Sequence, residues 1–484
     1  MEWPDITPIL PEIILAGAAL LVLLVEPFLK RDKTAVIAIA LTGLLASGVV
    51  ALALFSDNRV GFAGMIVLNE YAVFFKVLFA LAAAMAIMMS PRYLEASGRH
   101  LGEYYALLLF ALIGMNVMAA ARDFIAFYVG LELMAVSSYL LAGFFRYNLR
   151  SNEAALKYFF TGVFASTFTL FGISLVYGLS GSTNYLAVGQ ALMAGESTTA
   201  VAFATALVIA GLGFKVSVVP FHMWTPDVYQ GAPTPVAAFF SVGPKAAGFA
   251  GIVAIFATVF AVSAPTWSMI FIVLAILTMF VGNSMAIVQT NMKRMLAFSS
   301  IAHVGYLLAA LAALGRGAEA AAGSAILLYL AAYTFMNLGA FAILTYLKTQ
   351  QPQGFDYSLK AFAGLGRRSP WAAALFTLFL FSLTGIPGTA GFIGKFYLFS
   401  AVVQADLVWL AVVGVLFSAV SAYYYLRLVV YMYFREPEVE FASPRPIEGV
   451  LAASLALSAI GVLFIGILPS WLWEVAKTAF ANFY

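Results

Sequence analysis

Cysteine is absent from the 484 residues of this chain, and charged residues are scarce. Without cysteine the chain forms no disulfide, no iron–sulfur ligation of its own and no c-type haem attachment. Charged residues make up 10% of the sequence, and the net charge of +3 is too small to predict a nucleic-acid partner. What the sequence has instead is 63% hydrophobic residues and a mean hydropathy of +0.98. This composition predicts an all-α polytopic membrane protein in contact with the lipid bilayer.

Histidine is also rare, with only His100, His222 and His303 in the chain. None has a neighbouring histidine or carboxylate at metal-ligand spacing, so we predict no metal site. The glycine clusters lie inside apolar runs and follow no strand, which argues against a nucleotide-binding loop. The first residues, MEWPDITPIL, carry two acids and no basic region, and therefore do not resemble a cleaved signal peptide. Any redox cofactor would belong to another subunit.

Long apolar runs dominate the rest of the sequence. A helix needs ~20 apolar residues to cross the hydrocarbon core of a bilayer, and about fourteen runs of that length can be found. The seventh and the twelfth are too long and too interrupted for one straight helix. The expected spans lie near 10–29, 34–55, 71–90, 103–121, 123–143, 153–179, 199–229, 234–260, 265–290, 294–314, 320–347, 370–402, 407–434 and 447–476.

Basic residues in the loops predict the orientation, because they concentrate on the cytoplasmic side of a membrane. Only Arg59, Arg122, Arg316 and Lys477 lie on one side. The loops after spans one, three, five, nine, eleven and thirteen hold Lys30, Arg31, Lys33, Arg92, Arg99, Arg146, Arg150, Lys293, Arg294, Lys348, Lys360, Arg367, Arg368, Arg435 and Arg445. We therefore expect both termini to face outward, on the periplasmic side of a bacterial inner membrane.

The spans group into blocks of similar length. We expect three N-terminal helices in 1–102, five helices in 103–260, five more in 261–434 and a last helix in 435–484. Because five is odd, the second block of five must run opposite to the first. The interrupted spans are the fourth member of each block, which indicates two inverted five-helix repeats.

Several ionisable residues fall inside the spans, where each mid-membrane charge costs ~2.5–3.5 kcal/mol on insertion scales. Glu132 lies near the middle of its span, in YVGLELMAVSS. The basic residues within spans are Lys76, Lys157, Lys215, Lys245, Lys395 and Arg427.

Position separates these residues into two groups. Lys76, Lys157 and Arg427 lie within a turn or two of a span end, so their side chains could extend to the interface by snorkelling. Lys245 and Lys395 have no such exit, and with Glu132 they need partners or a water-filled path. Lys215 lies late in its span but directly before a break, and we group it with them. The remaining span residues that titrate near neutral pH, His222 and His303, could be hydrogen-bonded core residues or members of a proton relay.

Both interrupted spans place a lysine beside the interruption. GLGFKVSVVPFH (211–222) has Lys215 ahead of Pro220, and GIPGTAGFIGKFYLF (385–399) has Pro387 and glycines ahead of Lys395. Proline frees backbone carbonyls, and irregular backbone at membrane depth is tolerated only where protein or water satisfies it. Paired interruptions of this kind mark transport sites. We therefore expect a polar pocket around each of these two lysines.

Three long motifs carry a family resemblance: FYVGLELMAVSSYLLAGF (127–144), FHMWTPDVYQGAPTPVAAFFSVGPKAA (221–247) and GIPGTAGFIGKFYLF (385–399). With them the chain resembles the antiporter-like membrane subunits of respiratory complex I, the proton-translocating NADH:quinone oxidoreductase. The lysine in GFIGKFYLF differs from the glutamate of M-type subunits. L-type subunits are longer and have an additional lateral helix.

The resemblance implies a fourteen-helix core and a subunit of a hetero-oligomeric translocase, with M-type and K/J/A-type neighbours. FMN, iron–sulfur clusters and quinone are then expected in other subunits, and none in this chain. It implies that Glu132 on the fifth helix partners Lys215 on the seventh, with Lys245 on the eighth and Lys395 on the twelfth. Lys157, His222 and His303 match positions where family members carry polar residues of the same axis.

The expected mechanism starts from an ion pair between Glu132 and Lys215, whose proton passes by water or His222 to Lys245 and then towards Lys395. A stand-alone or Mrp-type cation/proton antiporter subunit remains an alternative, as do a non-conducting scaffold and a quinone site. The scaffold requires an expensive set of buried charges, and the aromatic richness is typical of membrane packing and interfacial belts. Lysine carriers favour H⁺ over Na⁺, because a cationic amine repels Na⁺.

Overall fold

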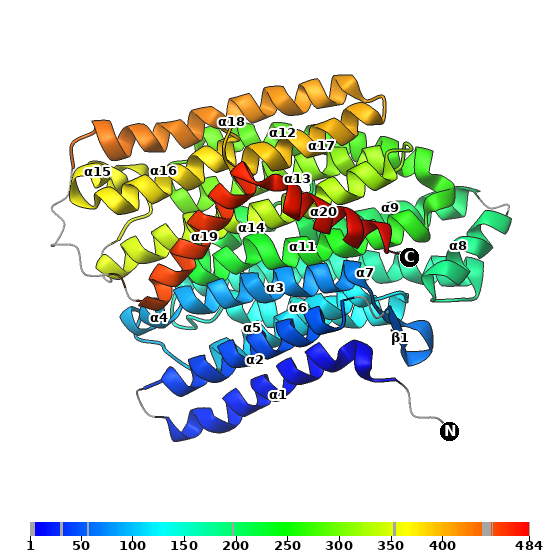
Figure 1. The fold of residues 1–484 in the computed structure, drawn as a ribbon, viewed down its shortest axis with the longest axis horizontal. Helices are drawn as coiled ribbons and strands as arrows, with labels where there is room; N and C mark the ends of the chain where they lie inside the picture. Colours follow the sequence, from blue (N-terminus) through cyan, green and yellow to red (C-terminus); the bar gives the residue numbers. More distant parts are fainter. Residues whose placement is uncertain are drawn as a thin grey trace.

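The computed structural model describes residues 5–29, 32–55, 58–195, 198–351, 355–437, 447 and 449–483. Three loop cations of the orientation argument, Lys30, Arg31 and Arg445, lie outside these residues. The described chain is a bundle of helices with one short antiparallel hairpin, β1 (Arg59–Gly61) and β2 (Ile66–Leu68). Figure 1 shows the long helices running roughly side by side, as expected for a polytopic membrane protein.

Twenty α-helices make up the described chain. They are α1 (Leu10–Val25), α2 (Thr34–Ala53), α3 (Glu70–Met89), α4 (Pro91–Ala96), α5 (Glu103–Ala120), α6 (Phe124–Ala142), α7 (Leu149–Ser180), α8 (Tyr185–Ala194), α9 (Thr198–Val216), α10 (Trp224–Gly231), α11 (Thr234–Thr258), α12 (Ala264–Val288), α13 (Met292–Leu314), α14 (Glu319–Gln350), α15 (Leu365–Arg368), α16 (Pro370–Thr384), α17 (Ala390–Gln404), α18 (Val408–Phe434), α19 (Gly449–Ile467) and α20 (Pro469–Ala481).

Among the described residues, 13 helices are long and apolar enough to cross a membrane. The twelfth expected span is formed by α16 and α17, which have 15 residues each and are too short to cross alone. With this broken crossing, the helices account for the fourteen spans expected from the sequence. Helix α1 begins and α20 ends at the same end of the bundle, as an even number of crossings requires (Figure 1).

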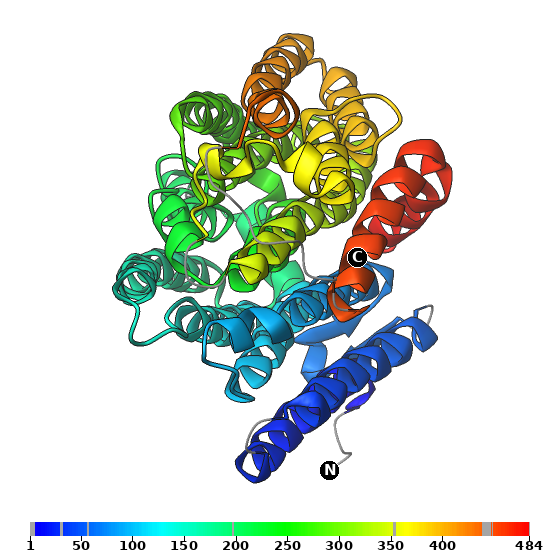
Figure 2. The ribbon, with the colours of Figure 1, turned by 90° about the vertical axis from the view of Figure 1, so that its left-hand side faces the viewer.

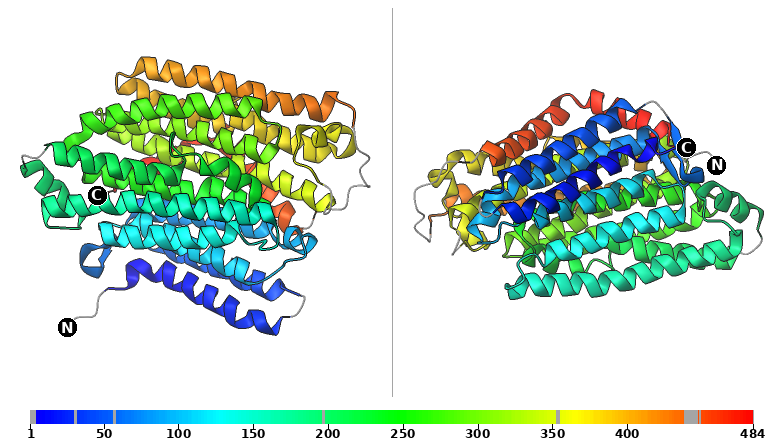
Figure 3. Two further views of the ribbon diagram at one scale, coloured as in Figure 1. Left: turned by 180° about the vertical axis from the view of Figure 1, so that it is seen from behind. Right: turned by 90° about the horizontal axis from the view of Figure 1, so that it is seen from below.

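The centre of the bundle is formed by α11, α13 and α14, whose most apolar windows are almost entirely buried. The end view in Figure 2 shows the other helices arranged around them, with α1 and α2 set at one edge. Helix α18 lies at the opposite edge from α1 and α2 (Figures 1 and 3). Ionisable residues on the central helices are therefore shielded from lipid on every side.

Small residues allow close helix packing in this bundle. Helices α5 and α6 cross at Gly114 and Gly130, where a Cβ on either glycine would overlap the backbone of the other helix. Membrane helices gain little from hydrophobic association with each other, so close backbone approach supplies much of their contact energy.

Both interruptions expected from the sequence are present. The first separates α9 from α10, and Ser217 at its start has a positive φ of 68°. The second separates α16 from α17, where Gly385 and Gly388 have φ values of 96° and 83°. Glycine adopts this left-handed region without the steric penalty of a Cβ. Gly385 therefore ends α16 as a left-handed C-cap.

The last expected span is wrong in one respect: it is two helices. Helix α19 ends at Ile467, and Pro469 is the first residue of α20, a position where the fixed φ of proline starts a new helix. The hairpin β1–β2 and helix α8 were also not expected. The inverted repeats, the domain boundaries and the sidedness of the termini stay predictions.

Candidate functional site

The second break holds Lys395 in a cage of oxygen atoms. Its Nζ donates to the carbonyl oxygens of Leu383 at 3.0 Å and Thr384 at 2.8 Å, and to Ser418 Oγ at 2.8 Å. The two carbonyls belong to the last turn of α16, where a helix leaves its carbonyls unpaired and carries a partial negative charge. The Tyr306 ring lies 5.1 Å from Nζ. The amine is therefore surrounded by oxygen atoms of the helix end that the break creates.

The first break holds Lys215 much more loosely. The side chain is buried at the end of α9, and its Nζ lies 3.4 Å from the Tyr139 hydroxyl. Its other close neighbours are the rings of Tyr139 and Phe214. The carbonyl of Phe214 is instead used by the indole Nε1 of Trp224, which donates to it at 2.9 Å. The break thus satisfies its own backbone and leaves the lysine with one weak hydrogen bond.

Glu132 faces the same region from α6, but it does not pair directly with Lys215. Among the ion pairs of the described residues, none joins these two side chains within 4.0 Å. Glu132 accepts a short hydrogen bond from Ser166 on α7. Its charge lies close enough to act on Lys215. The expected direct ion pair is therefore wrong for this structure, because a hydroxyl from α7 occupies the carboxylate and Tyr139 occupies the amine.

Lys245 lies at the centre of the bundle, on α11 directly after Pro244. Its side chain is 3% exposed, and Nζ donates to Ser300 Oγ on α13 at 2.5 Å. The Tyr229 ring lies 5.6 Å from Nζ. Because proline has no N–H, Pro244 leaves a carbonyl one turn earlier without its helical partner. A buried amine here has one strong polar contact and otherwise aromatic and aliphatic neighbours.

His303 lies on α13 between the two central lysines, and the charges of Lys245 and Lys395 both act on it. Both ring nitrogens have tyrosine partners. Nδ1 forms a short hydrogen bond with the hydroxyl of Tyr329 on α14, and Nε2 lies 3.2 Å from the hydroxyl of Tyr425 on α18. The imidazole is therefore buried and held from two sides.

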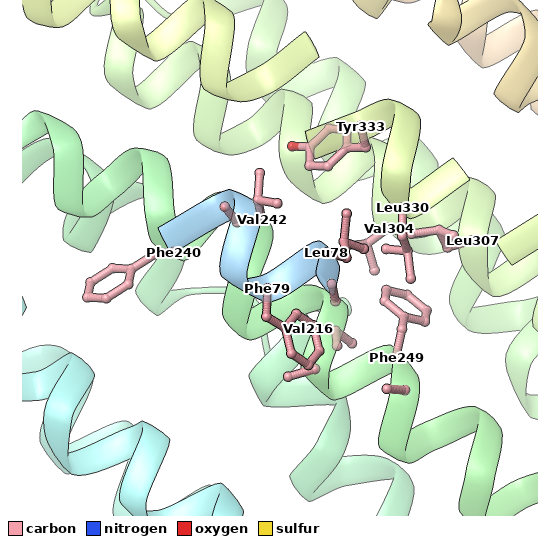
Figure 4. Close-up of a cluster of buried hydrophobic side chains, with 14 of the residues drawn as sticks. Leu78, Phe79, Val216, Phe240, Val242, Phe249, Val304, Leu307, Leu330 and Tyr333 are labelled. Carbon is pink, nitrogen blue, oxygen red and sulfur yellow. The ribbon is translucent and has the colours of Figure 1, made fainter. Parts of the chain in front are cut away.

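A small cavity of ≈10 Å³ lies between Lys245, Ser300, His303 and Tyr333. This is about the smallest space that holds one water molecule. Apolar side chains enclose it. Five of the apolar residues that line it, Val242, Phe249, Val304, Leu307 and Leu330, are seen in Figure 4 in one buried cluster with Tyr333.

Two of the candidate residues lie elsewhere. His222 is half-buried in the first break, where the charge of Lys245 acts on it. Lys157 is exposed and forms ion pairs with Glu153 at 2.7 Å and Asp227 at 2.6 Å. Asp227 also pairs with Arg294. The structure therefore places Lys157 in a peripheral charge network, apart from the buried lysines, because two carboxylates at the helix ends attract it.

Of the two remaining span cations, Lys76 does not snorkel, so that expectation is wrong, and Arg427 is half-buried. Lys76 is 2% exposed and forms an ion pair with Glu12 of α1 at 2.9 Å. Arg427 donates to the carbonyl oxygens of Ile287 and Gln289, where α12 ends. Each finds its partner on a neighbouring helix, which sequence spacing does not reveal.

Sequence reasoning missed the hydroxyl groups that contact the ionisable residues. They are Tyr139, Ser166, Ser300, Tyr329, Ser418 and Tyr425. A usable signal was present in SSIAHVGY, where Ser299 and Ser300 stand one turn before His303. Tyrosines in this chain are more than packing and belt residues, since several hold the site.

Comparison with known proteins identifies the class. The profile of the family described as NADH:quinone oxidoreductase/Mrp antiporter, transmembrane, matches residues 121–421, which include both breaks and all the buried lysines between them. The fold and the match to this family profile together identify the chain as an antiporter-like membrane subunit.

Relatives over the full length narrow this class. The chain is 44% identical over 479 residues to NADH-quinone oxidoreductase subunit N of Trichlorobacter lovleyi, covering 98% of this chain and 97% of that one. It is 44% identical over 483 residues to subunit N 1 of Solibacter usitatus, covering 99% and 98%. The chain belongs to the family of NADH-quinone oxidoreductase subunit N.

Solved structures agree with this fold. A chain of respiratory complex I from Thermus thermophilus superposes with a TM-score of 0.82 at 33% identity, covering 96% of this chain and 99% of that one. A chain of the Mrp complex from Dietzia reaches a TM-score of 0.86 at 23% identity, covering 99% and 98%. At that lower identity the likeness concerns the fold alone.

Proposed function

We propose that this chain is a proton-translocating membrane subunit of NADH:quinone oxidoreductase. The observation that carries the proposal is the row of buried amines at Lys215, Lys245 and Lys395, two of them beside broken helices. Buried amines without carboxylate partners are expensive in a membrane. Burial disfavours the charged form of an amine, and a nearby opposite charge favours it. A buried amine can therefore take up and release a proton when a neighbouring charge moves.

Lys215 is the group that a neighbouring charge can switch. It has one long hydrogen bond to Tyr139, and Glu132 lies near it without direct contact. If Glu132 leaves Ser166 and approaches the amine, the charged form of Lys215 gains an electrostatic partner. If Glu132 withdraws, the amine releases its proton towards Lys245, with His222 near the route.

Lys245 and Lys395 continue the route through the second half of the chain. Lys245 donates to Ser300, and His303 lies between the two lysines. Lys395 sits at the outer end of this series, where backbone carbonyls and Ser418 stabilise its charge. It is the proposed exit or the link to the next subunit.

The chain works in this scheme as part of an oxidoreductase complex, and as a translocase it carries out no redox step itself. FMN, iron–sulfur clusters and quinone belong to other subunits. M-type and K/J/A-type membrane subunits are the proposed neighbours in the hetero-oligomer. The proposed location is a bacterial inner membrane, with both termini on the outer side.

An Mrp-type cation/proton antiporter is the second candidate, because the description of the matching family profile names the Mrp antiporter beside the oxidoreductase. The higher identity to subunit N relatives favours the oxidoreductase. Co-purification separates them: a subunit of NADH:quinone oxidoreductase purifies with flavin and iron–sulfur proteins, and an antiporter subunit does not.

The deciding experiment is Lys395→Ala, tested as proton pumping per NADH oxidised in membrane vesicles, with assembly checked on a native gel. We expect an assembled complex that has lost pumping or coupled activity. The matched control is Lys477→Ala, which removes an exposed lysine paired with Glu474 at 2.8 Å. Pumping that is normal in both variants would overturn the role of Lys395.

A further inference from the structure

The imidazole of His303 has no nitrogen open to an incoming proton. Tyr329 occupies Nδ1 and Tyr425 occupies Nε2. The cavity beside Lys245 and Ser300 reaches His303, but a water molecule in it finds both nitrogens already bonded. A proton therefore reaches the ring through a tyrosine hydroxyl, or only after one of these hydrogen bonds breaks.

Hydrogen-bond chemistry gives the two tyrosines opposite roles at any moment. A neutral imidazole has one N–H donor and one acceptor nitrogen. One tyrosine hydroxyl must then donate to the ring while the other accepts from it. Each hydroxyl both donates and accepts, so the direction of the whole chain reverses when one proton passes along it.

Hydrogen bonds extend this chain beyond Nε2, and packing places its other end close to Lys395. Beyond Nε2, the Tyr425 hydroxyl forms a short hydrogen bond with Ser299 Oγ, and the next residue, Ser300, accepts from Lys245. Beyond Nδ1, the ring of Tyr329 packs against α17 at Gly394, where a Cβ would overlap it. Gly394 directly precedes Lys395. The hydrogen-bonded series therefore runs from Ser299 to Tyr329. Lys245 is bonded to the serine next to one end, and Lys395 follows the glycine packed against the other.

We propose that Tyr425 and Tyr329 are proton-transfer residues that carry a proton through His303 between Lys245 and Lys395. This inference rests on the proposed function. In the forward step, Tyr425 gives its hydroxyl proton to Nε2 and takes one from the Ser299 side. The Nδ1 proton passes to the Tyr329 oxygen, which releases its own proton towards Lys395. One proton enters, one leaves, and each tyrosine and the imidazole end neutral with the chain reversed.

The test is Tyr425→Phe and Tyr329→Phe in the assembled complex, with proton flux and NADH oxidation measured in the same vesicles. Phenylalanine keeps the ring and removes only the hydroxyl. The matched control is Tyr104→Phe, since Tyr104 is fully buried and its hydroxyl also pairs with a serine, Ser90, at 2.8 Å. We expect at least a tenfold loss of coupled flux in the first two variants and none in the control.

A second pair of measurements separates proton transfer from packing. Ser299→Ala removes the far end of the chain without touching a ring, and should lower the flux several-fold if Tyr425→Phe fails to assemble. Difluorotyrosine at position 425 keeps ring and hydroxyl but makes the phenol more acidic. It should shift the dependence of flux on pH, whereas the same analogue at position 104 should not.

The variant Lys245→Met separates failure of the tyrosine relay from failure of the proposed function. If it abolishes pumping while both tyrosine variants pump normally, the tyrosine relay is wrong and the proposed function stands. If Lys245→Met also pumps normally, the proposed function fails. Equal losses in Tyr425→Phe and Tyr104→Phe, with no pH shift for the analogue, would mean a packing effect and would overturn the relay.

Discussion

The two broken helices hold their lysines in different ways. At the break between α16 and α17, Lys395 donates to two carbonyl oxygens and one hydroxyl within 3.0 Å. At the break between α9 and α10, Lys215 has the Tyr139 hydroxyl at 3.4 Å and aromatic rings. The same sequence pattern, a lysine beside a helix interruption, therefore gives one amine held by several oxygens and one loosely held amine.

The cause is the position of each lysine relative to the break. Lys395 follows its break and reaches back to the last turn of α16, whose carbonyls lack helical partners. Lys215 precedes its break, and the freed carbonyl of Phe214 is taken by Trp224. A loosely held amine responds to a nearby charge more than one fixed by several oxygens. We therefore propose that the first break serves switching and that the second stabilises the charge.

The largest effect is expected from removing the switching amine or the central lysine. Lys215→Met and Lys245→Ala should each abolish coupled pumping, because the proton then lacks a group to occupy along the route. Assembly should survive, since neither lysine holds backbone carbonyls. Pumping per NADH oxidised, with native-gel quantification of the complex, measures both. A normal stoichiometry in Lys215→Met would remove the distinction between the breaks.

Substitutions of the two lysines at the breaks, Lys395 and Lys215, should differ in their effect on the stability of the complex. Lys395→Met leaves the buried carbonyl of Leu383 without a donor, at about 1–3 kcal/mol for an unsatisfied group, and leaves that of Thr384 only the longer hydrogen bond from Ser418 at 3.3 Å. Lys215→Met leaves no such carbonyl. Thermal dissociation of the purified complex should therefore begin at a lower temperature for Lys395→Met than for Lys215→Met. Equal melting of the two variants would mean that the oxygen cage does not stabilise the break.

The backbone of the second break should tolerate a side chain poorly. Gly385 has a φ of 96°, and a Cβ there would also meet the Lys395 side chain. Gly385→Ala should cost about 1–2 kcal/mol from the left-handed conformation alone. Gly178 is a matched control, because it is helical and a Cβ there has nothing within 4 Å. Thermal stability of Gly385→Ala equal to that of Gly178→Ala would contradict the role of Gly385 as a required cap.

The smallest effect is expected at Lys157, which belongs to neither break. Its ion pairs with Glu153 and Asp227 are partly exposed, and such pairs contribute about 0–1 kcal/mol. Lys157→Met should leave pumping per NADH oxidised within experimental error of the unmodified complex. A loss of pumping comparable to that of Lys215→Met would place Lys157 on the proton route, as the family resemblance implied.

Much of the fold follows from local sequence. Apolar runs of about 20 residues predict the crossings, and the glycines and prolines beside Lys215 and Lys395 predict both breaks. The residues that the buried charged side chains contact were less predictable. Snorkelling was expected for Lys76, yet it pairs with Glu12 on a helix 64 residues away, because that pairing depends on which faces of α1 and α3 meet.

The buried amines were also visible in the sequence, but their surroundings were not. A lysine in an apolar run can be recognised as unusual from the sequence, because a charge inside a bilayer is energetically costly. A tyrosine in the same run is ordinary, so Tyr329 and Tyr425 carried no signal of their own. The direct pair between Glu132 and Lys215 failed for the same reason, since Ser166 and Tyr139 compete for the two groups.

The sequence by itself determined that this chain crosses a membrane repeatedly, breaks two of its helices and buries amines next to the breaks. Hydropathy and backbone chemistry act over a few neighbouring residues, so they can be read along the chain. The tertiary structure alone decided what each buried group contacts. His303 meets hydroxyls from residues 26 and 122 positions away, because such contacts depend on how the helices are rotated and packed against each other.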